Sequence, residues 1–221
     1  MYNFIFNIPT KIHFGKDTIS SLSELKAYGS KVLLVYGGGS IKKNGLYDTA
    51  MKILKDAGLT VFELSGVEPN PKIETVRKGV EICKNEGIDM VLAIGGGSTI
   101  DCSKVVAAGA KYDGDAWDLV LDGSKVKAAL PIFDVLTLSA TGTEMDPFAV
   151  ISDMSKNEKW GTGSPYMVPT MSILNPEYTF SVSKKQTAAG TADMMSHTME
   201  NYFSMENADC RNLWQRDCYV Q

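Results

Sequence analysis

The stretch Met90-Val91-Leu92-Ala93-Ile94-Gly95-Gly96-Gly97-Ser98 decides the fold, because it joins a fully apolar strand to a glycine loop. An apolar run without alternation is typical of a strand that is buried on both faces. We expect a helix after the loop, as far as about Ala108. The same pattern occurs upstream, where Lys31-Val32-Leu33-Leu34-Val35-Tyr36 precedes Gly37-Gly38-Gly39-Ser40. Two copies predict strands of one sheet with both loops at its carboxyl edge, where doubly wound folds bind ligands.

Strands and helices alternate on both sides of these junctions. Ile73, Val76, Val80 and Cys83 follow helical spacing, and Gly87 comes next as a cap. Such alternation requires right-handed crossovers, so the predicted fold class is α/β, with a Rossmann-like, doubly wound parallel sheet. The expected helices also include residues 46–57, and the further strands are residues 60–64 and 131–138.

The remaining parts of the chain are less regular. Residues 3–14 predict two short strands broken by Pro9, in an edge hairpin. Residues 149–179 predict irregular structure, because glycines and prolines interrupt short apolar pieces. Helical sequence returns at residues 184–203. We therefore expect one α/β domain over residues 1–180 and the start of a second domain over residues 181–221.

Composition excludes several classes of protein. The chain has 221 residues and a formal net charge of −4, with no basic cluster, which argues against a nucleic-acid partner. No apolar run is long enough to span a bilayer, and the first residues do not have the pattern of a signal peptide. Cys83 and Cys102 show no ligand-like pairing, so we expect free thiols in a cytoplasmic protein.

The two Gly-Gly-Gly-Ser loops are candidates for binding phosphate groups. Glycine lets backbone N–H groups approach a ligand, and the helix behind it contributes partial positive charge. A single such loop is equally a tight turn. In the first loop no carboxylate is present to repel a 2′-phosphate, and Lys42 and Lys43 follow closely. This favours NADP over NAD, unless the two lysines are only a solvated helix start.

Three other features could contribute to a site. Thr137-Leu138-Ser139-Ala140-Thr141-Gly142-Thr143-Glu144 follows a strand and is rich in hydroxyl groups, although it could be an ordinary turn. Asp101 either compensates the helix dipole or contacts a ligand. Asp193 and His197, four residues apart on one helical face, could hold a divalent metal or form an exposed polar pair.

Several ordered motifs make the sequence resemble the iron-containing alcohol dehydrogenase family. Within it, the NADPH-dependent butanol dehydrogenase and aldehyde reductase branch is the most similar, and the resemblance extends over residues 6–208. The motifs are Phe14-Gly15-Lys16, Tyr36-Gly37-Gly38-Gly39-Ser40-Ile41-Lys42-Lys43-Asn44-Gly45, Gly66-Val67-Glu68-Pro69-Asn70-Pro71, Gly95-Gly96-Gly97-Ser98-Thr99-Ile100-Asp101, Ala140-Thr141-Gly142-Thr143-Glu144 and Gly190-Thr191-Ala192-Asp193-Met194-Met195-Ser196-His197.

The resemblance implies hydride transfer between NADP(H), with NAD(H) as the alternative cofactor, and a primary alcohol or aldehyde such as butanol or butyraldehyde. It implies an α/β dinucleotide-binding domain, a helical metal-binding domain and a homodimer when full length. Asp193 and His197 would be ligands of iron or zinc. The implied cofactor contacts are Gly38, Gly39, Ser40, Gly95, Gly96, Gly97, Ser98, Asp101, Thr137, Leu138, Lys159 and Tyr178. Asp146 stands where a close relative has an amide, so that contact is not carried over.

The resemblance also implies two further histidine ligands, and this chain has no histidine after His197. The sequence after Ala208 departs from the family, and a shifted reading frame over residues 209–221 gives a segment that resembles the family's next helix. We therefore expect a frameshift and a mostly absent helical domain. The alternative functions are a catalytically incompetent nucleotide-binding fragment and a sugar-phosphate cyclase resembling dehydroquinate synthase.

Overall fold

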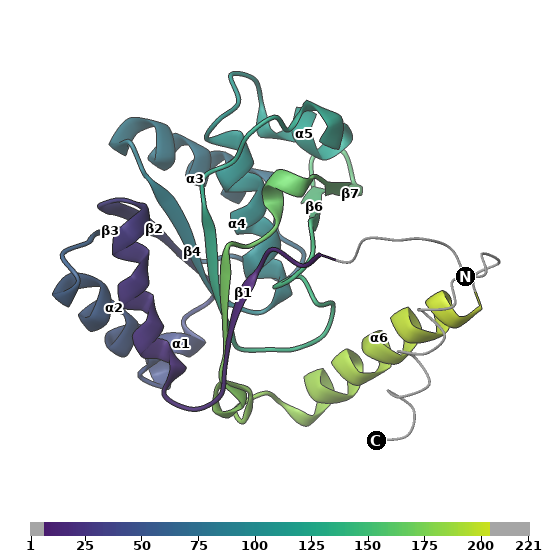
Figure 1. Ribbon diagram of the computed structural model, residues 1–221. Helices are drawn as coiled ribbons and strands as arrows, with labels where there is room; N and C mark the ends of the chain where they lie inside the picture. The colour runs from purple at the N-terminus through teal and green to yellow at the C-terminus, as the bar shows by residue number, and fades with distance from the viewer. Residues whose placement is uncertain (1–6, 204–221) are drawn as a thin grey trace.

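The structure, a computed structural model, describes residues 7–203 (Figure 1). Residues 209–221, for which we expect the frameshift, lie outside this range. The strands are β1 (Lys11–Phe14), β2 (Lys31–Tyr36), β3 (Thr60–Leu64), β4 (Met90–Gly95), β5 (Ile132–Leu136), β6 (Phe148–Asp153), β7 (Glu158–Gly163) and β8 (Met171–Leu174). The helices are η1 (Thr18–Tyr28), α1 (Ser40–Lys43), α2 (Leu46–Asp56), α3 (Ile73–Glu86), α4 (Gly97–Gly109), α5 (Ala116–Leu121), η2 (Gly123–Lys125), η3 (Pro165–Met167), η4 (Pro176–Thr179) and α6 (Lys184–Tyr202).

The main sheet is parallel and has the strand order β1-β8-β5-β4-β2-β3. From β2 the chain first moves outward to β3 and then returns to β4 on the other side. The direction of strand succession therefore reverses between β2 and β4. Such a switch point opens a crevice at the carboxyl ends of the strands. Both Gly-Gly-Gly-Ser loops follow the two strands that flank it.

Helices cover both faces of the sheet, which confirms the doubly wound α/β fold (Figure 1). Leu33 and Val35 of β2 belong to a core with residues of α3, α4 and α5. Val32 and Leu34 belong to a second core with residues of η1 and α2. Because adjacent residues of β2 enter opposite cores, both faces of this strand must be apolar, which explains its unbroken hydrophobic run.

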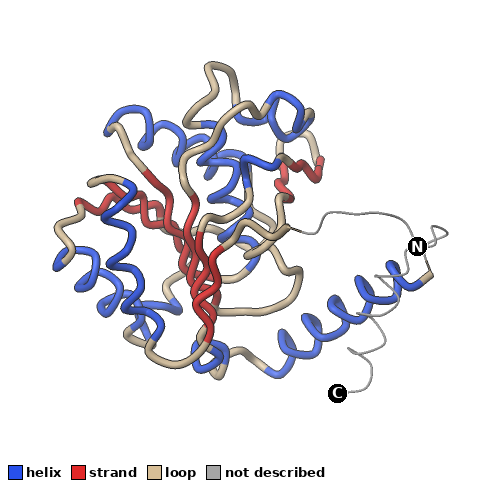
Figure 2. The backbone as a smooth tube through the Cα atoms, in the orientation of Figure 1, coloured by secondary structure: helices blue, strands red, loops and turns tan. Residues whose placement is uncertain are grey.

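Two sequence expectations are wrong. Residues 149–179 are not irregular throughout, because β6 and β7 form an antiparallel hairpin and β8 joins the main sheet beside β5 (Figure 2). These segments are short and rich in glycine and proline, so the spacing of their apolar residues alone does not predict them as strands. At the other end, β1 pairs in parallel with β8, whereas we expected a local hairpin there. Residues 3–6 of that predicted hairpin lie outside the described range.

The predicted helix over residues 184–203 is confirmed as α6, which projects from the α/β part of the chain (Figure 1). It approaches the sheet domain at Gly190, where an added Cβ would lie 3.0 Å from the carbonyl oxygen of Ser139. The division into domains at residue 180 stays a prediction. Among the described residues, no helix is long and apolar enough to cross a membrane.

Candidate functional site

The two glycine loops are joined by the segment Gly66-Val67-Glu68-Pro69-Asn70-Pro71. The amide of Gly66 donates to the carbonyl of Gly37 at 3.2 Å, on the first loop. The amide of Asn70 donates to Ser98 Oγ at 3.3 Å, on the second loop. The side chain of Asn70 also accepts a hydrogen bond from Lys159 Nζ at 2.7 Å. Asn70 thus connects the second loop with β7. We did not predict this role from the sequence, although a turn at Asn70 was indicated by its place between two prolines.

The glycines of these loops serve different purposes. An added Cβ at Gly37 would lie 3.2 Å from the carbonyl oxygen of Val67, so close backbone packing requires glycine there. Gly39 has a φ of +102°, which disfavours side chains. Gly38 has no atom within 4 Å of an added Cβ, so this position faces open space. An open position in a loop otherwise restricted by packing is accessible to a ligand.

The second loop begins α4 without a side-chain cap. Gly96 is the N-cap residue, and no side chain accepts a hydrogen bond from the first turn. The N-terminus of a 13-residue helix therefore presents backbone N–H groups and the positive end of the helix dipole to the crevice. Together with the open backbone of the loop, this arrangement can receive the oxygens of a phosphate group.

Thr137 and Leu138 lie against the second loop, as they must if all three contact the same cofactor. The amide of Thr137 donates to the carbonyl of Gly95 at 2.9 Å. The Cβ of Leu138 would be 3.2 Å from a Cβ added at Gly96. The segment after β5 therefore forms one wall of the crevice, and its hydroxyl-rich part continues along the N-terminal end of α4.

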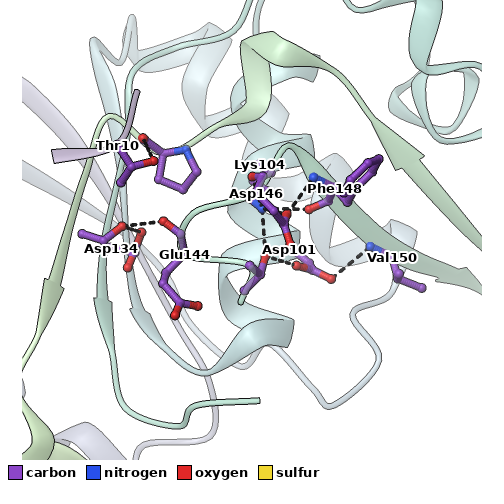
Figure 3. Close-up of polar contacts among 11 residues, drawn as sticks. Thr10, Asp101, Lys104, Asp134, Glu144, Asp146, Phe148 and Val150 are labelled. Atoms are coloured by element: carbon purple, nitrogen blue, oxygen red, sulfur yellow. Dashed lines mark hydrogen bonds and ion pairs between the residues drawn. The ribbon is translucent and has the colours of Figure 1, made fainter. Parts of the chain in front are cut away.

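Behind this wall a buried lysine organises the polar contacts (Figure 3). Lys104 of α4 has no exposed surface. Its Nζ donates to Thr143 Oγ1 at 2.8 Å, to Asp146 Oδ1 at 2.8 Å and to the Phe148 carbonyl at 2.8 Å. A buried ammonium is tolerated only when such acceptors compensate its desolvation. Sequence reasoning missed Lys104, because a lysine nearly two helical turns after the loop looks like a solvated residue.

Asp101 belongs to the same network. Thr143 Oγ1 donates to one carboxylate oxygen at 2.6 Å, and the amide of Val150 donates to the other at 3.0 Å. Burial raises the pKa of Asp101, although these two hydrogen bonds and the charge of Lys104 oppose the rise. Asp101 therefore links α4 to the hairpin β6–β7, in addition to the two roles considered from the sequence.

Tyr178 belongs to η4, which follows β8 on the β4 side of the switch point, away from the first glycine loop. Desolvation raises the pKa of its hydroxyl. A neighbouring cavity of about 150 Å³ is lined by Phe14, Leu136, Leu174, Pro176 and other residues at the ends of β1, β5 and β8. Its walls combine these apolar residues with the polar groups of Ser139, Glu144, Asn175 and Thr179. Such a pocket suits a flat, partly apolar group.

Asp193 and His197 face each other on α6. His197 Nε2 lies 3.7 Å from Asp193 Oδ1, and the two side chains are 55% and 41% exposed. The predicted proximity is confirmed, whereas the metal role stays a prediction. The part of the chain that the structure describes contains no group of three or more residues able to hold a metal ion.

Fold and edge geometry define a doubly wound α/β protein with two glycine loops at the switch point of its sheet. The family model for iron-containing alcohol dehydrogenases matches residues 9–176. The chain belongs to this family of oxidoreductases. This assignment decides against the sugar-phosphate cyclase alternative.

Similar proteins match most of this chain. NADH-dependent butanol dehydrogenase A of Clostridium acetobutylicum is 62% identical over 205 residues, which are 92% of this chain and 53% of that protein. The NADPH-dependent aldehyde reductase YqhD of Escherichia coli is 40% identical over 91% of this chain and 52% of that protein. The crystal structure of NADH-dependent butanol dehydrogenase A from Thermotoga maritima matches with a TM-score of 0.93 and 47% identity, over 97% of this chain and 55% of that one. The chain thus spans about half the length of these relatives.

Proposed function

We propose that this chain forms the nucleotide-binding part of a metal-dependent alcohol dehydrogenase or aldehyde reductase. The complete enzyme would transfer a hydride between NADP(H) and a primary alcohol or aldehyde such as butanol or butyraldehyde. The observation that carries the proposal is the pair of glycine loops at the switch point. The segment of residues 66–71 contacts both loops, and an uncapped helix follows the second one. A dinucleotide needs such a crevice, because its pyrophosphate requires N–H donors and close backbone approach.

The proposed cofactor contacts divide along the carboxyl edge. Gly95, Gly96, Gly97 and Ser98 would bind the pyrophosphate, and Gly38, Gly39 and Ser40 would bind the adenosine ribose and its 2′ substituent. Thr137, Leu138 and Tyr178 would bind the adenine ring, because their chain neighbours Leu136, Ser139 and Thr179 line the cavity. Asp101 and Lys159 would support the nicotinamide end, where they are connected to β6, β7 and Asn70.

We further propose that NADPH binds more tightly than NADH. The first loop contributes no carboxylate, Gly38 faces open space, and Lys43 is exposed close by. The names of the relatives divide on this point, because the C. acetobutylicum protein is NADH-dependent and YqhD is NADPH-dependent. We therefore attribute the choice between NADPH and NADH to charges near the first loop. A binding experiment measures this choice directly as two dissociation constants.

A divalent iron or zinc ion would be held by Asp193 and His197. Their donor atoms approach within 3.7 Å on adjacent helical turns, which fits two neighbouring coordination positions. When bound, the metal supplies Lewis acidity and the nicotinamide supplies the hydride. Two half-exposed donors are an incomplete site, so a complete site would need ligands beyond this pair.

The test is a fluorescence titration of the 221-residue chain with NADPH and NADH. We expect both to bind, NADPH more tightly. Gly38→Asp should reverse the preference, because a carboxylate repels a 2′-phosphate and accepts a ribose hydroxyl; Gly38→Asn is the neutral control of the same shape. Equal dissociation constants, or tighter NADH binding, would refute the preference. Binding of neither nucleotide would refute the site itself.

The second candidate function is nucleotide binding without catalysis. It is favoured by the half-exposed Asp193–His197 pair, which belongs to no group of three or more metal-binding residues among those that the structure describes. The two candidates differ in one assay: only the enzyme reduces butyraldehyde with NADPH in a metal-dependent way. Nucleotide affinity is expected for both.

A further inference from the structure

Four side chains form a compact cluster beside the first glycine loop. We call it the Glu63 cluster, after the carboxylate at its centre, and its other members are Tyr36, Lys42 and Tyr47. The hydroxyl of Tyr36 donates to Glu63 Oε2 at 2.6 Å, and the hydroxyl of Tyr47 donates to Oε1 at 2.7 Å. Both carboxylate oxygens are therefore held by phenol groups, and the charge of Glu63 has a defined position.

Lys42 is drawn into this cluster. Its Nζ lies 4.0 Å from Glu63 Oε2, and it is 5.0 Å and 4.4 Å from the ring centroids of Tyr36 and Tyr47. An ammonium group over two electron-rich rings and near a carboxylate is attracted by all three. The side chain nevertheless remains 48% exposed. Lys42 thus has a preferred position that it can still leave.

Glu63 is negatively charged at neutral pH. Partial burial raises the pKa of its carboxyl group, but the hydrogen bonds from Tyr36 and Tyr47 and the charge of Lys42 together lower it below its ordinary value. The fold therefore places an anion beside a loop whose own sequence contains only cations. This anion comes from β3, the neighbour of β2 at the edge of the sheet.

We infer that Glu63 is a positioning residue that weakens the preference for NADPH by holding Lys42 in the Glu63 cluster. The inference rests on the proposed nucleotide site. A 2′-phosphate near Gly38 and Ser40 gains most from Lys42 if the ammonium turns toward it, and Glu63 competes for the same ammonium. The charge of Glu63 also repels a phosphate within a Debye length. NADH carries a neutral 2′-hydroxyl, so its binding is insensitive to this competition.

The first test is Glu63→Gln in the 221-residue chain, titrated with NADPH and NADH. We expect the dissociation constant of NADPH to fall about three- to tenfold, a size typical of partly exposed charge pairs. The constant for NADH should stay within about twofold, because no ion pair with the nucleotide is involved. Glu81→Gln removes the same charge from the exposed surface of α3 and should change neither constant. An unchanged NADPH/NADH ratio in Glu63→Gln would overturn the inference.

A double-mutant cycle with Lys42→Met shows whether Glu63 acts through Lys42. In the Lys42→Met background, Glu63→Gln should improve NADPH binding clearly less than in the unmodified chain, because only the direct repulsion between Glu63 and the phosphate remains to be removed. A full improvement in that background would overturn the role of Lys42. Tyr47→Phe keeps the ring but removes one hydrogen bond to Glu63, so it should give an intermediate effect even if Glu63→Gln folds poorly. If the unmodified chain binds neither nucleotide, the proposed function fails; if it binds both and these variants leave the ratio unchanged, only this inference fails.

Discussion

Asp134 shows how one residue can make stability depend on pH. It lies in the middle of β5 with no exposed surface, and its Oδ2 is 2.5 Å from Ser172 Oγ. Ser172 Oγ also lies 2.7 Å from the carbonyl oxygen of Glu144 (Figure 3). One hydroxyl hydrogen cannot serve both acceptors. A protonated Asp134 resolves the conflict, because it donates to Ser172, which then donates to Glu144.

Burial raises the pKa of Asp134 well above its ordinary value of 3.8, in spite of the hydrogen bond with Ser172. Below pH 3.8 the carboxyl group is protonated in both the folded and the unfolded chain. Between 3.8 and the folded pKa, only the unfolded chain releases the proton. We therefore expect this group to lower the free energy of unfolding by about 1.4 kcal/mol per pH unit as pH rises through that window.

Asp134→Asn should remove this dependence, because the amide donates to Ser172 at every pH. Urea denaturation between pH 4 and 8 measures the difference between the variant and the unmodified chain. Asp56→Asn, at the exposed end of α2, is the control. Parallel pH profiles for the unmodified chain and Asp134→Asn would contradict a protonated Asp134.

At the scale of elements, Lys104 joins α4 to the segment that leads into β6. Lys104→Met keeps the length of the side chain but leaves Asp146 and the Phe148 carbonyl without their donor. We expect the free energy of unfolding to fall by roughly 3–5 kcal/mol, as for other broken buried pairs. Nucleotide affinity should also fall, because Thr143, which binds Asp101 beside the second loop, loses its hydrogen bond from Lys104. Urea denaturation and NADPH titration measure the two effects.

Lys78→Met is the matched control for Lys104→Met, because Lys78 is exposed on α3. It should change the free energy of unfolding by less than about 0.5 kcal/mol. If Lys104→Met also stays within this range, the contacts of Lys104 contribute no net stability.

The elements also differ in how far sequence could predict them. β2, β3 and α3 have the predicted bounds, because buried runs and helical spacing are local signals. β8 has only four residues, Met171–Leu174, and is flanked by prolines. Its place between β5 and β1 depends on pairing with distant strands, which no local pattern contains.

At the scale of the whole molecule, α6 exposes an apolar surface. Met195, Met199 and Tyr202 are 50%, 40% and 52% exposed and follow helical spacing along one face. A contiguous apolar patch favours association. We expect the 221-residue chain to self-associate with rising concentration, measured by sedimentation velocity.

Met195→Gln combined with Met199→Gln should reduce this association. Met154→Gln is the control, since Met154 is 60% exposed but lies outside α6. A monodisperse monomer of the unmodified chain at high concentration would count against the prediction.

The metal site permits a prediction about activity. The chain contains only two histidines, His13 and His197, and His13 lies in β1 with Nδ1 3.0 Å from Ser21 Oγ. As the proposed metal ligands, Asp193 and His197 alone would hold an ion weakly, because affinity depends on the number and preorganisation of the ligands. We expect no significant NADPH-dependent reduction of butyraldehyde by the 221-residue chain with added Zn²⁺ or Fe²⁺. Turnover that Asp193→Ala abolishes would prove this wrong.

The sequence by itself determined the α/β class, the two glycine loops and their common edge. These follow from residues adjacent in the chain, whose burial and backbone freedom are local properties. Only the tertiary structure decided that Glu63 lies beside Lys42, that Lys104 binds Asp146 and that Asn70 connects the second loop with Lys159. Each of these contacts joins residues of different elements, so it depends on strand order and helix packing. A count of charges along the sequence of the first loop therefore misses Glu63, because this carboxylate belongs to the neighbouring strand β3.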